Sequence, residues 1–319
     1  MLQARLRWRP AALDAALLGA LLVTLLPWLG RRFDLLDLAA QFLIQGMVAT
    51  ALITAVALLR RRLAHAGLAA GCLVLQLGTI QPGLVPGDLA PARAAPPGAL
   101  RVLMFNVWIG NRRPAELLGL VAAEQPDALV LVEVVDGWRE IVDLLAPDYP
   151  ARLDCLHLPG CDVVILAKEP LRDGLATRDP ATGTPFVRAR LQRADGALTI
   201  VGTHLIRPVG VGTLADQLRQ AHWLAGRLAE IDGPLLLTGD FNAVGWGRLM
   251  TTLADATGLT LLPSLHGTYP APLPWPLRIP IDHALISPEL AGATLRTGRH
   301  LGSDHRPLLI ELPPPRAAG

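Results

Sequence analysis

Acidic residues are scarce in the first third of this 319-residue chain. Residues 1–99 contain four acids and nine arginines between long runs of Leu, Ala and Val, and the whole chain is 51% hydrophobic. Three stretches, 11–29, 35–59 and 66–85, approach the roughly 20 apolar residues that cross a bilayer. This pattern excludes a simple soluble protein, and a cleavable signal peptide would explain only the first stretch. We therefore expect three transmembrane helices in a membrane anchor, residues 1–85.

The placement of arginine predicts the orientation of this anchor. Three arginines precede the first span, three lie between the second and third, and two lie in the remaining loop: Arg5, Arg7 and Arg9; Arg60, Arg61 and Arg62; Arg31 and Arg32. Basic loops tend to stay in the cytoplasm, so the N-terminus is expected inside. Three spans then place the rest of the chain outside. We expect a multi-pass protein of the cell (inner) membrane with an extracytoplasmic, periplasmic domain.

A net positive charge is lacking after the anchor. Residues 100–319 hold 20 basic and 23 acidic residues, so this part has no basic footprint of the kind that tight nucleic-acid binding needs. Five prolines and three glycines precede it within residues 82–99. Such a stretch reads as a semi-extended spacer. We assign 86–99 as a Pro/Gly/Ala-rich linker, 100–312 as one catalytic domain and 313–319 as a tail.

Short apolar runs alternate with amphipathic segments in this domain. We predict strands at 100–107, 128–134, 162–167, 186–191, 198–203, 235–238, 281–287 and 307–311. We predict helices at 114–124, 137–145, 214–230 and 245–256. Strands outnumber helices and several hairpins are expected. The pattern therefore favours a layered α/β domain with mixed sheets over a doubly wound parallel sheet.

Polar side chains recur at the ends of these strands in a definite order. Along the chain they are Asn106, Glu133, His204, Asp240, Asn242, Asp282, Asp304 and His305. Each one alone could be a turn former, a surface carboxylate or a satisfied core histidine. Together they supply two imidazoles and the oxygen ligands that Mg²⁺ prefers, and no Ser or Cys stands in the setting of a nucleophile. They therefore indicate metal-assisted hydrolysis of a phosphate ester.

These residues resemble the endonuclease/exonuclease/phosphatase superfamily, which has the DNase I-like fold. The resemblance covers roughly residues 100–312 and rests on six motifs in order: Phe105-Asn106-Val107, Val132-Glu133-Val134, Thr203-His204-Leu205, Gly239-Asp240-Phe241-Asn242, Ile281-Asp282-His283 and Ser303-Asp304-His305-Arg306-Pro307. Three spans followed by this domain are similar to a bacterial membrane-anchored branch of the superfamily. The resemblance implies a four-layer α/β/β/α sandwich whose two mixed sheets open into a cleft.

The resemblance also implies which residues bind metal and phosphate. Glu133 matches the metal ligand, assisted by Asn106 and Asp304, and the implied ion is Mg²⁺ or Mn²⁺. His204 matches a histidine that contacts the phosphate or the leaving group. Arg188 matches a phosphate-binding arginine.

The acid–base residues follow from the same resemblance. Asp240 and Asn242 match the pair that orients the attacking water and the phosphate. Asp282 matches the carboxylate that pairs with His305. The proton acceptor is either Asp240 or the His305–Asp282 pair. Many members have Gln before the metal-binding glutamate, where this chain has Val132, and this departure removes a supporting hydrogen bond but not the ligand.

The implied function is a metal-dependent phosphoesterase that hydrolyses a phosphodiester or a phosphomonoester outside the cytoplasm. Tethering at a lipid bilayer and the mildly acidic domain favour phospholipid head groups or small phosphoesters as substrates. An extracytoplasmic nuclease acting on nucleic acid is the alternative, because this fold hosts all of these chemistries. A catalytically inactive binding protein is expected to have lost at least one motif residue, and all of them are present.

Cysteine is rare, with three residues in the chain. Cys72 falls in the third span, which leaves Cys155 and Cys161 in the outer domain. Pro159-Gly160 between them is a turn former that brings the two thiols together. Two free thiols, or a metal pair with His157, are the alternatives. Because the domain is expected in an oxidising compartment, we predict a disulfide, which would contribute roughly 2 kcal/mol.

Overall fold

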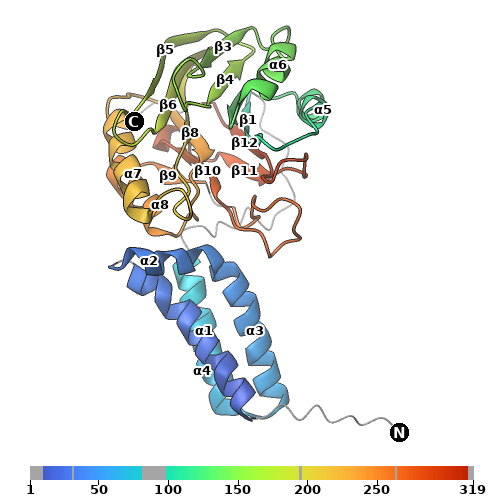
Figure 1. The fold of residues 1–319 in the computed structure, drawn as a ribbon, viewed down its shortest axis with the longest axis vertical. Coiled ribbons are helices and arrows are strands. Elements are labelled where there is room, and N and C mark those ends of the chain that lie inside the picture. Colours follow the sequence, from blue (N-terminus) through green and yellow to red (C-terminus); the bar gives the residue numbers. More distant parts are fainter. Residues whose placement is uncertain (1–9, 31, 81–97, 194–195, 263, 315–319) are drawn as a thin grey trace. The chain divides into compact units, whose positions relative to one another are not determined.

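The structure, a computed structural model, describes residues 10–30, 32–80, 98–193, 196–262 and 264–314 (Figure 1). The chain divides into two compact units. One consists of residues 1–82 with 246–248, and the other of residues 83–245 with 249–319.

The N-terminal unit is helical. Its elements are α1 (Pro10–Gly30), α2 (Asp34–Asp37), the 3-10 helix η1 (Leu38–Phe42), α3 (Leu43–Leu59) and α4 (Leu63–Ile80). Three stretches are long and apolar enough to cross a membrane: Ala11–Gly30, Asp34–Leu59 and Leu63–Ile80. The three long apolar helices predicted from the sequence are therefore present. The third begins before its expected start at residue 66, and residues 81–85 lie outside the described residues.

A buried glutamine joins three of these helices. Gln76 of α4 donates through Nε2 to Thr24 Oγ1 of α1 at 2.9 Å and to Thr50 Oγ1 of α3 at 3.2 Å. Both threonine hydroxyls donate in turn to backbone carbonyls four residues earlier in their own helices. In a lipid environment the hydrophobic effect does not drive apolar helices together, and interhelical hydrogen bonds of this kind stabilise their packing there.

The first sheet of the second unit has six strands. Their spatial order is β11 (Thr294–Thr297), β12 (Leu308–Leu312), β1 (Leu100–Asn106), β2 (Ala128–Val132), β4 (Val164–Ala167) and β3 (Ala151–Asp154). β1 and β2 run parallel, and the other neighbours run antiparallel. Helices α5 (Ala115–Glu124) and α6 (Asp136–Leu144) pack on one face of this sheet, where Phe105, Leu117 and Trp138 share a core.

The second sheet also has six strands. Their order is β5 (Leu171–Arg178), β6 (Pro185–Arg193), β7 (Gly196–His204), β8 (Leu235–Asp240), β10 (Asp282–Ile286) and β9 (Thr260–Leu261). β7 and β8 run parallel, and the remaining pairs run antiparallel. Helices α7 (Leu214–Leu228) and α8 (Arg248–Thr257) cover one face, where Leu224, Phe241 and Leu249 meet.

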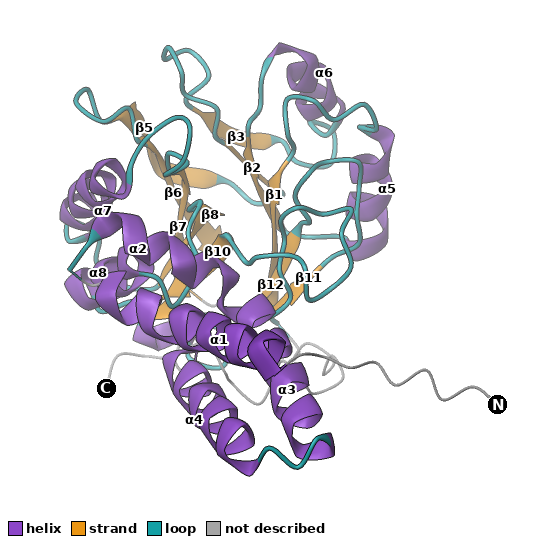
Figure 2. Ribbon diagram, turned by 60° about the horizontal axis from the view of Figure 1, so that its bottom comes forward, coloured by secondary structure: helices purple, strands orange, loops and turns teal. Residues whose placement is uncertain are grey.

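The two sheets pack face to face, with the helix pairs outside them (Figure 2). Apolar side chains from both sheets fill the space between, among them Val130 and Ile165 of the first and Ile200 and Leu236 of the second. Val132 belongs to this core as well. The expected four-layer α/β/β/α sandwich of two mixed sheets, preceded by three long apolar helices, is confirmed.

None of the four edge strands is predicted from the sequence. These strands, β3, β5, β9 and β11, flank the two sheets. An edge strand is half-solvated and carries polar side chains, so it lacks the apolar run that marks a central strand. β5 shows this, because Arg172, Asp173 and Gly174 are exposed in its first half.

Several predicted boundaries also differ from the observed ones, by one to three residues. The strand predicted at 128–134 ends at Val132, because Glu133 turns the chain with a φ of 60°. The helix predicted from residue 245 begins at Arg248. By contrast, α7 begins where its sequence indicates. Thr213 and Asp216 form a capping box, in which each side chain accepts a hydrogen bond from the other residue's backbone N–H.

Candidate active site

Strand direction brings the polar residues to one edge of both sheets. β1 and β2 run parallel and end at this edge in the first sheet, and β7 and β8 do the same in the second. β4, β10 and β12 are antiparallel to these neighbours, so each begins there. Residues that follow β1, β2, β7 and β8, or precede β4, β10 and β12, therefore converge.

Asn106 links the metal-ligand candidate to the second sheet. Its Nδ2 donates to Glu133 Oε1 at 3.0 Å and to Asp240 Oδ2 at 2.9 Å, while its Oδ1 accepts from Trp108 N–H. Asn106 is fully buried. The other oxygen of Glu133, Oε2, accepts from Ile109 N–H at 3.2 Å. One amide therefore holds two carboxylates at a fixed spacing.

Asp240 stands at the centre of the site and is 1% exposed. Its Oδ1 accepts the backbone N–H of Asn242 at 2.8 Å. Asn242 adopts a φ of 51°, a left-handed conformation that Asn tolerates, and its Nδ2 donates to Leu205 O. The preceding Gly239 is required by packing, since a Cβ there would lie 1.9 Å from Thr203 O of the neighbouring strand.

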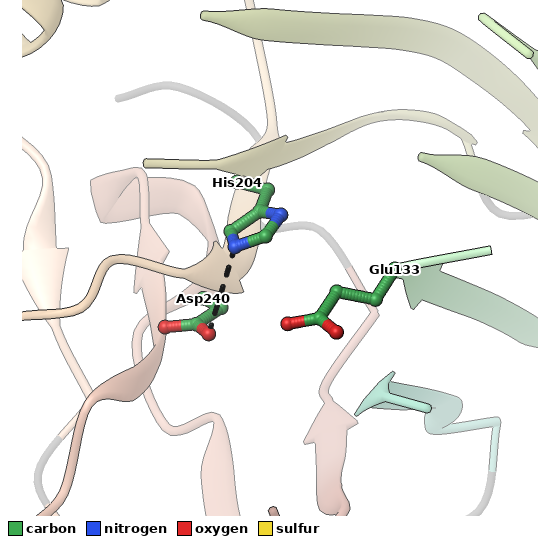
Figure 3. Close-up of side chains that lie close together, drawn as sticks. All are labelled: Glu133, His204 and Asp240. Atoms are coloured by element: carbon green, nitrogen blue, oxygen red, sulfur yellow. Dashed lines mark ion pairs between the residues drawn. The ribbon is translucent and has the colours of Figure 1, made fainter. Parts of the chain in front are cut away.

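Two histidine–carboxylate pairs flank Asp240. His305 Nδ1 lies 2.8 Å from Asp282 Oδ2, and its Nε2 lies 3.6 Å from Asp240 Oδ2. His204 Nδ1 lies 2.8 Å from Asp162 Oδ2, and its Nε2 lies 3.9 Å from the same Asp240 oxygen (Figure 3). In each pair the outer carboxylate fixes the ring so that Nε2 faces Asp240.

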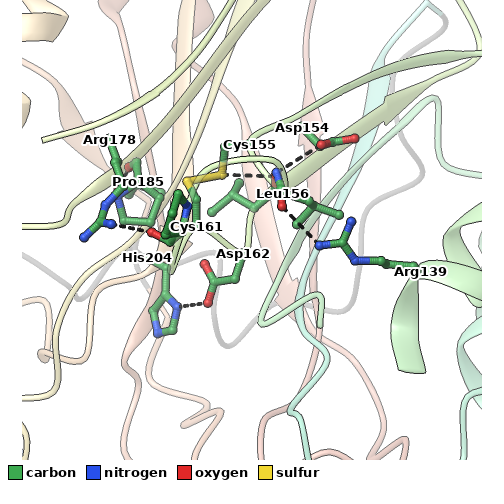
Figure 4. Close-up of a disulfide and its surroundings, with 12 residues drawn as sticks. Arg139, Asp154, Cys155, Leu156, Cys161, Asp162, Arg178, Pro185 and His204 are labelled. Atoms are coloured by element: carbon green, nitrogen blue, oxygen red, sulfur yellow. Dashed lines mark hydrogen bonds and ion pairs between the residues drawn. A yellow bond between two sulfur atoms is a disulfide. The ribbon is translucent and has the colours of Figure 1, made fainter. Parts of the chain in front are cut away.

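A disulfide stands directly before Asp162. Cys155 and Cys161 are bonded, with their Cα atoms 5.5 Å apart, as the sequence analysis predicts (Figure 4). The Asp162 carbonyl accepts Val134 N–H at 3.0 Å, while its carboxylate holds His204. A single residue next to the disulfide therefore contacts both the segment that carries Glu133 and the first histidine.

The C-terminal motif, Ser303-Asp304-His305, is hydrogen-bonded to the last residue of β1. Ser303 Oγ donates to Asn106 O at 2.8 Å and accepts His305 N–H at 2.9 Å. The Asp304 carboxylate is 29% exposed, and its Oδ1 lies 4.0 Å from His305 Nε2. The Tyr269 ring lies 5.1 Å from the His305 ring.

The crowded carboxylates raise the pKa values of their neighbours. Burial is the largest influence on Asp240 and raises its pKa; Asp282 also raises it, His305 and His204 lower it, and the resulting pKa is about 6. Burial lowers the pKa of His305, but Asp282, Asp240 and Asp304 outweigh burial and bring it to about 10. For His204, burial is again outweighed, chiefly by Asp162, and the pKa rises to about 9.

The donor set fits a divalent cation. Ligand atoms of Glu133, His204 and Asp240 lie within 4.8 Å of one another, and so do those of Asp240, Asp282 and His305. Burial raises the pKa of Asp304, and among the described residues its buried Oδ1 has no hydrogen-bond partner. The raised pKa values of His204 and His305 keep both rings protonated, so the carboxylate oxygens are the available ligands. Hard oxygen ligands of this kind suit Mg²⁺ or Mn²⁺.

The order of these motifs can be compared with known families. A sequence model of the endonuclease/exonuclease/phosphatase family matches residues 104–305, which is more than half of the chain. The chain belongs to this family. A search among curated protein sequences finds no match.

Solved structures share the family fold at low identity. SmcL superposes with a TM-score of 0.57 at 12% identity, covering 68% of this chain and 100% of that chain. Sphingomyelinase C from Streptomyces griseocarneus gives 0.51 at 17% identity, over 67% and 99% of the two chains. D. rerio TDP2, crystallised with a single-strand DNA product, gives 0.56 at 15%, over 68% and 99%. Such identities show the fold alone.

Arg188 is not part of this cluster of side chains. It lies within β6, opposite Val201 of β7 and Leu175 of β5, three residues in from the strand end that carries His204. Val201 and Leu175 pack in the core beneath α7 and α8. The other predicted site residues gather at the edge described above, although Asp304 belongs to neither of the two groups of close ligand atoms.

Two residues at this family site are not predicted from the sequence. Asp162 lies two residues before the apolar strand β4, and Asp282 is the first residue of β10; this similar position is a signal that could have revealed Asp162. Gln217 carries no such signal, because it lies within α7. Its buried Nε2 donates to the carbonyls of Ile206, Phe241 and Asn242, and so ties together the loops that follow His204 and Asp240.

Proposed function

We propose that this protein is a membrane-anchored, divalent-metal-dependent phosphoesterase that hydrolyses a phosphodiester or phosphomonoester outside the cytoplasm. One observation carries the proposal: the Nε2 atoms of two oriented histidines face one Asp240 carboxylate oxygen, beside Glu133. Family membership supports phosphoester hydrolysis, because hydrolases of this family and fold act on phosphoesters.

Glu133 would hold the metal ion, assisted by Asn106 and Asp304. Such an ion supplies a Lewis acid that offsets the charge developing on the phosphoryl oxygens. The protein contributes a fixed geometry, because the Glu133 carboxylate is already held by Asn106 Nδ2 and Ile109 N–H. Asn106 also keeps Asp240 at a constant distance from Glu133.

Asp240 is the proton acceptor in this proposal. Its pKa of about 6 leaves it ionised at neutral pH, whereas the higher pKa values of both histidines keep their rings protonated. The attacking water forms its bond to phosphorus and passes a proton to Asp240. Asn242 N–H, bound to Asp240 Oδ1, directs the other carboxylate oxygen toward the site.

His204 is the proton donor to the leaving oxygen. Its Nε2–H points into the site because Asp162 holds Nδ1. When the ester bond breaks, the leaving oxygen takes this proton and the ring becomes neutral. Asp240 Oδ2, 3.9 Å from His204 Nε2, can then return the proton taken from water. His305, held by Asp282, stabilises the Asp240 and phosphoryl charges throughout.

A substrate panel tests the proposed function. The full chain, purified in detergent, is incubated with phospholipid vesicles, p-nitrophenyl phosphate, bis(p-nitrophenyl) phosphate, DNA or RNA, with Mg²⁺, Mn²⁺ or EDTA. We expect hydrolysis of a phosphate ester with either metal and none with EDTA. Absence of turnover on every substrate with both metals would refute the proposal. Turnover confined to DNA or RNA would establish the nuclease alternative.

Asp162→Asn should shift the pH dependence of turnover. Asp162 contributes most to the raised His204 pKa, so its neutral replacement removes that contribution and the pKa falls. Protonated His204 is then lost at a lower pH. The alkaline limb of the kcat profile should move to lower pH, and kcat at pH 8 should fall by about tenfold. Asp148→Asn, which alters an exposed carboxylate, is the control; an unchanged profile for Asp162→Asn would contradict the assignment.

We assign residues 1–85 to a membrane anchor, 86–99 to a linker, 100–312 to the catalytic domain and 313–319 to a tail. Three helices of sufficient length and apolarity support the anchor. The excess of arginine before the first span and after the second supports an inner N-terminus and a periplasmic catalytic domain. The Cys155–Cys161 disulfide supports an oxidising compartment.

Thiol labelling tests this location. Protein extracted from membranes and denatured without reductant should label with maleimide at Cys72 alone, and at all three cysteines after reduction. Cys72 is the internal control, because it is a buried free thiol within α4 that becomes accessible on denaturation. Labelling of Cys155 and Cys161 before reduction would exclude the disulfide in the cell and remove the support that it gives to a periplasmic domain.

A further inference from the structure

Exposed apolar side chains are concentrated around the candidate active site. Within the described part of residues 98–314, the exposed large apolar residues are Ile109, Leu144, Val209, Val211, Leu273, Trp275 and Leu277. All but Leu144 lie on three loops: the one after β1, the one after β7 and the one before β10. These are the strand ends that form the site edge. We call these six residues the apolar rim.

Each rim loop is bonded to a site residue or lies beside one. Ile109 N–H donates to Glu133 Oε2. The loop after His204 carries Val209 and Val211, each more than half exposed. The third loop packs on the C-terminal motif, because Ala271 N–H donates to Asp304 O at 2.6 Å. A surface that the rim contacts would therefore lie next to the reacting groups.

The third loop presents its apolar side chains in a fixed arrangement. Prolines occupy positions 270, 272, 274 and 276, alternating with apolar residues that include Leu273 and Trp275. Proline restricts φ, so little conformational entropy remains to be lost on binding. The Trp275 indole N–H donates to Leu265 O at 3.1 Å, and Arg278 Nη1 donates to Leu273 O. Half of the Trp275 side chain still faces solvent.

We propose that the apolar rim inserts into the surface of a lipid bilayer, and that the phosphoester hydrolysed is that of a membrane lipid. This inference rests on the proposed function for the substrate, and on the apolar surface for the binding. Exposed apolar residues gathered on one face mark an interaction site. Tryptophan favours the boundary between hydrocarbon and water.

A bilayer is the partner proposed for the rim because the chain's own three apolar helices would hold the catalytic domain close to one. Nineteen residues, 81–99, separate α4 from β1. A chain of that length spans at most about 65 Å, so the catalytic domain cannot leave the membrane that the three helices would cross. Tethering keeps the effective concentration of lipid high. Exposed Arg112 and Arg207 on the rim loops add attraction to lipid phosphates.

A comparison of two substrates tests the rim by activity. The triple variant Leu273→Ser, Trp275→Ser, Leu277→Ser is reconstituted as the full chain in vesicles. We expect kcat/KM toward vesicle phospholipid to fall at least about tenfold, because three apolar contacts with hydrocarbon are lost. Turnover of water-soluble bis(p-nitrophenyl) phosphate should stay within twofold. Val209→Ser with Val211→Ser should show the same selectivity from a separate loop.

Leu144→Ser is the matched control. Leu144 is as exposed as Ile109, at 63%, but lies at the C-terminal end of α6 outside the rim. Its variant should keep both activities. An equal loss on both substrates in both rim variants would show that the rim supports the site instead of binding lipid, and would overturn the inference. Selective loss on DNA or RNA would overturn it in favour of nucleic acid.

A fluorescence measurement decides the binding without relying on activity. Vesicles containing brominated lipid quench tryptophans that enter the hydrocarbon. The difference between the spectra of the unmodified chain and of Trp275→Phe isolates Trp275, and we expect its emission to be quenched. Unquenched Trp275 emission would refute insertion of the rim even if lipid is hydrolysed. Quenching in a chain that hydrolyses no phosphoester would support insertion while refuting the proposed function.

Discussion

Asp240→Asn should lower kcat by about 10² to 10⁴-fold while leaving KM within a few-fold, because general-base catalysis contributes that range. The asparagine keeps the shape of the side chain but cannot accept the proton of the attacking water. It also cannot return a proton to His204 Nε2. The measurement is steady-state turnover on the substrate found in the panel, at saturating metal.

The same substitution should destabilise the domain but leave it folded. The carboxylate of Asp240 accepts from Asn106 Nδ2 through one oxygen and from Asn242 N–H through the other, and an asparagine can keep only one of these bonds. The lost bond costs about 1–3 kcal/mol. Burial penalises the ionised carboxylate of Asp240 and raises its pKa, and a neutral asparagine avoids this penalty, which offsets part of that cost.

Asp232→Asn is the control for this experiment, because Asp232 is an exposed carboxylate just before β8. It should change neither turnover nor the thermal midpoint. If Asp240→Asn retains kcat within tenfold, Asp240 is not the base, and His305 with Asp282 becomes the acceptor. Failure of Asp240→Asn to fold would instead assign the carboxylate a structural role.

The site could be predicted from the sequence where it follows buried strands. Asn106, Glu133, His204 and Asp240 each end an apolar run, and the central strands β1, β2, β7 and β8 bring them to one edge. Hydrophobic pattern identifies such strands because both of their faces are covered. The family resemblance then assigned roles that pattern alone left open.

The hydrophobic pattern could not predict residues whose position relative to the site depends on tertiary contacts. Arg188 lies in a central strand between the apolar residues Val187 and Ala189, and strand alternation turns it to the same face as Phe186, which packs beneath α7 and α8. Gln217 resembles any polar helix residue until α7 docks against the site loops. The apolar rim could not be predicted either, because the sequence around Trp275 does not show whether its side chain is buried or exposed.

The edge strands show the same limit for the fold. β5 pairs with β6 through backbone groups and needs no apolar run of its own. Its exposed first half, with Arg172 and Asp173, therefore has the sequence character of a loop. The central strands were sufficient to predict a layered α/β domain with mixed sheets, although four strands were missed. The arrangement as a four-layer sandwich was implied by the family resemblance and not by the strand pattern.

Glu133→Gln should raise the dissociation constant for Mn²⁺ by at least about 10 to 100-fold, since loss of a supporting partner alone costs that much at metal sites. The amide keeps one oxygen acceptor in place of two. It can satisfy Asn106 Nδ2 or Ile109 N–H, but not both as Glu133 does. Isothermal titration calorimetry on the full chain in detergent measures the affinity directly.

Metal titration of turnover separates this variant from Asp240→Asn. Raising Mn²⁺ should restore a large part of kcat in Glu133→Gln, because its defect is occupancy of the metal site, and none in Asp240→Asn, whose defect is proton transfer. Glu140→Gln, on the exposed side of α6, should bind metal with unchanged affinity. If Glu133→Gln binds Mn²⁺ as tightly as the unmodified chain, the ion is held elsewhere. The Asp240, Asp282 and His305 group then becomes the candidate, because its ligand atoms also lie within 4.8 Å of one another.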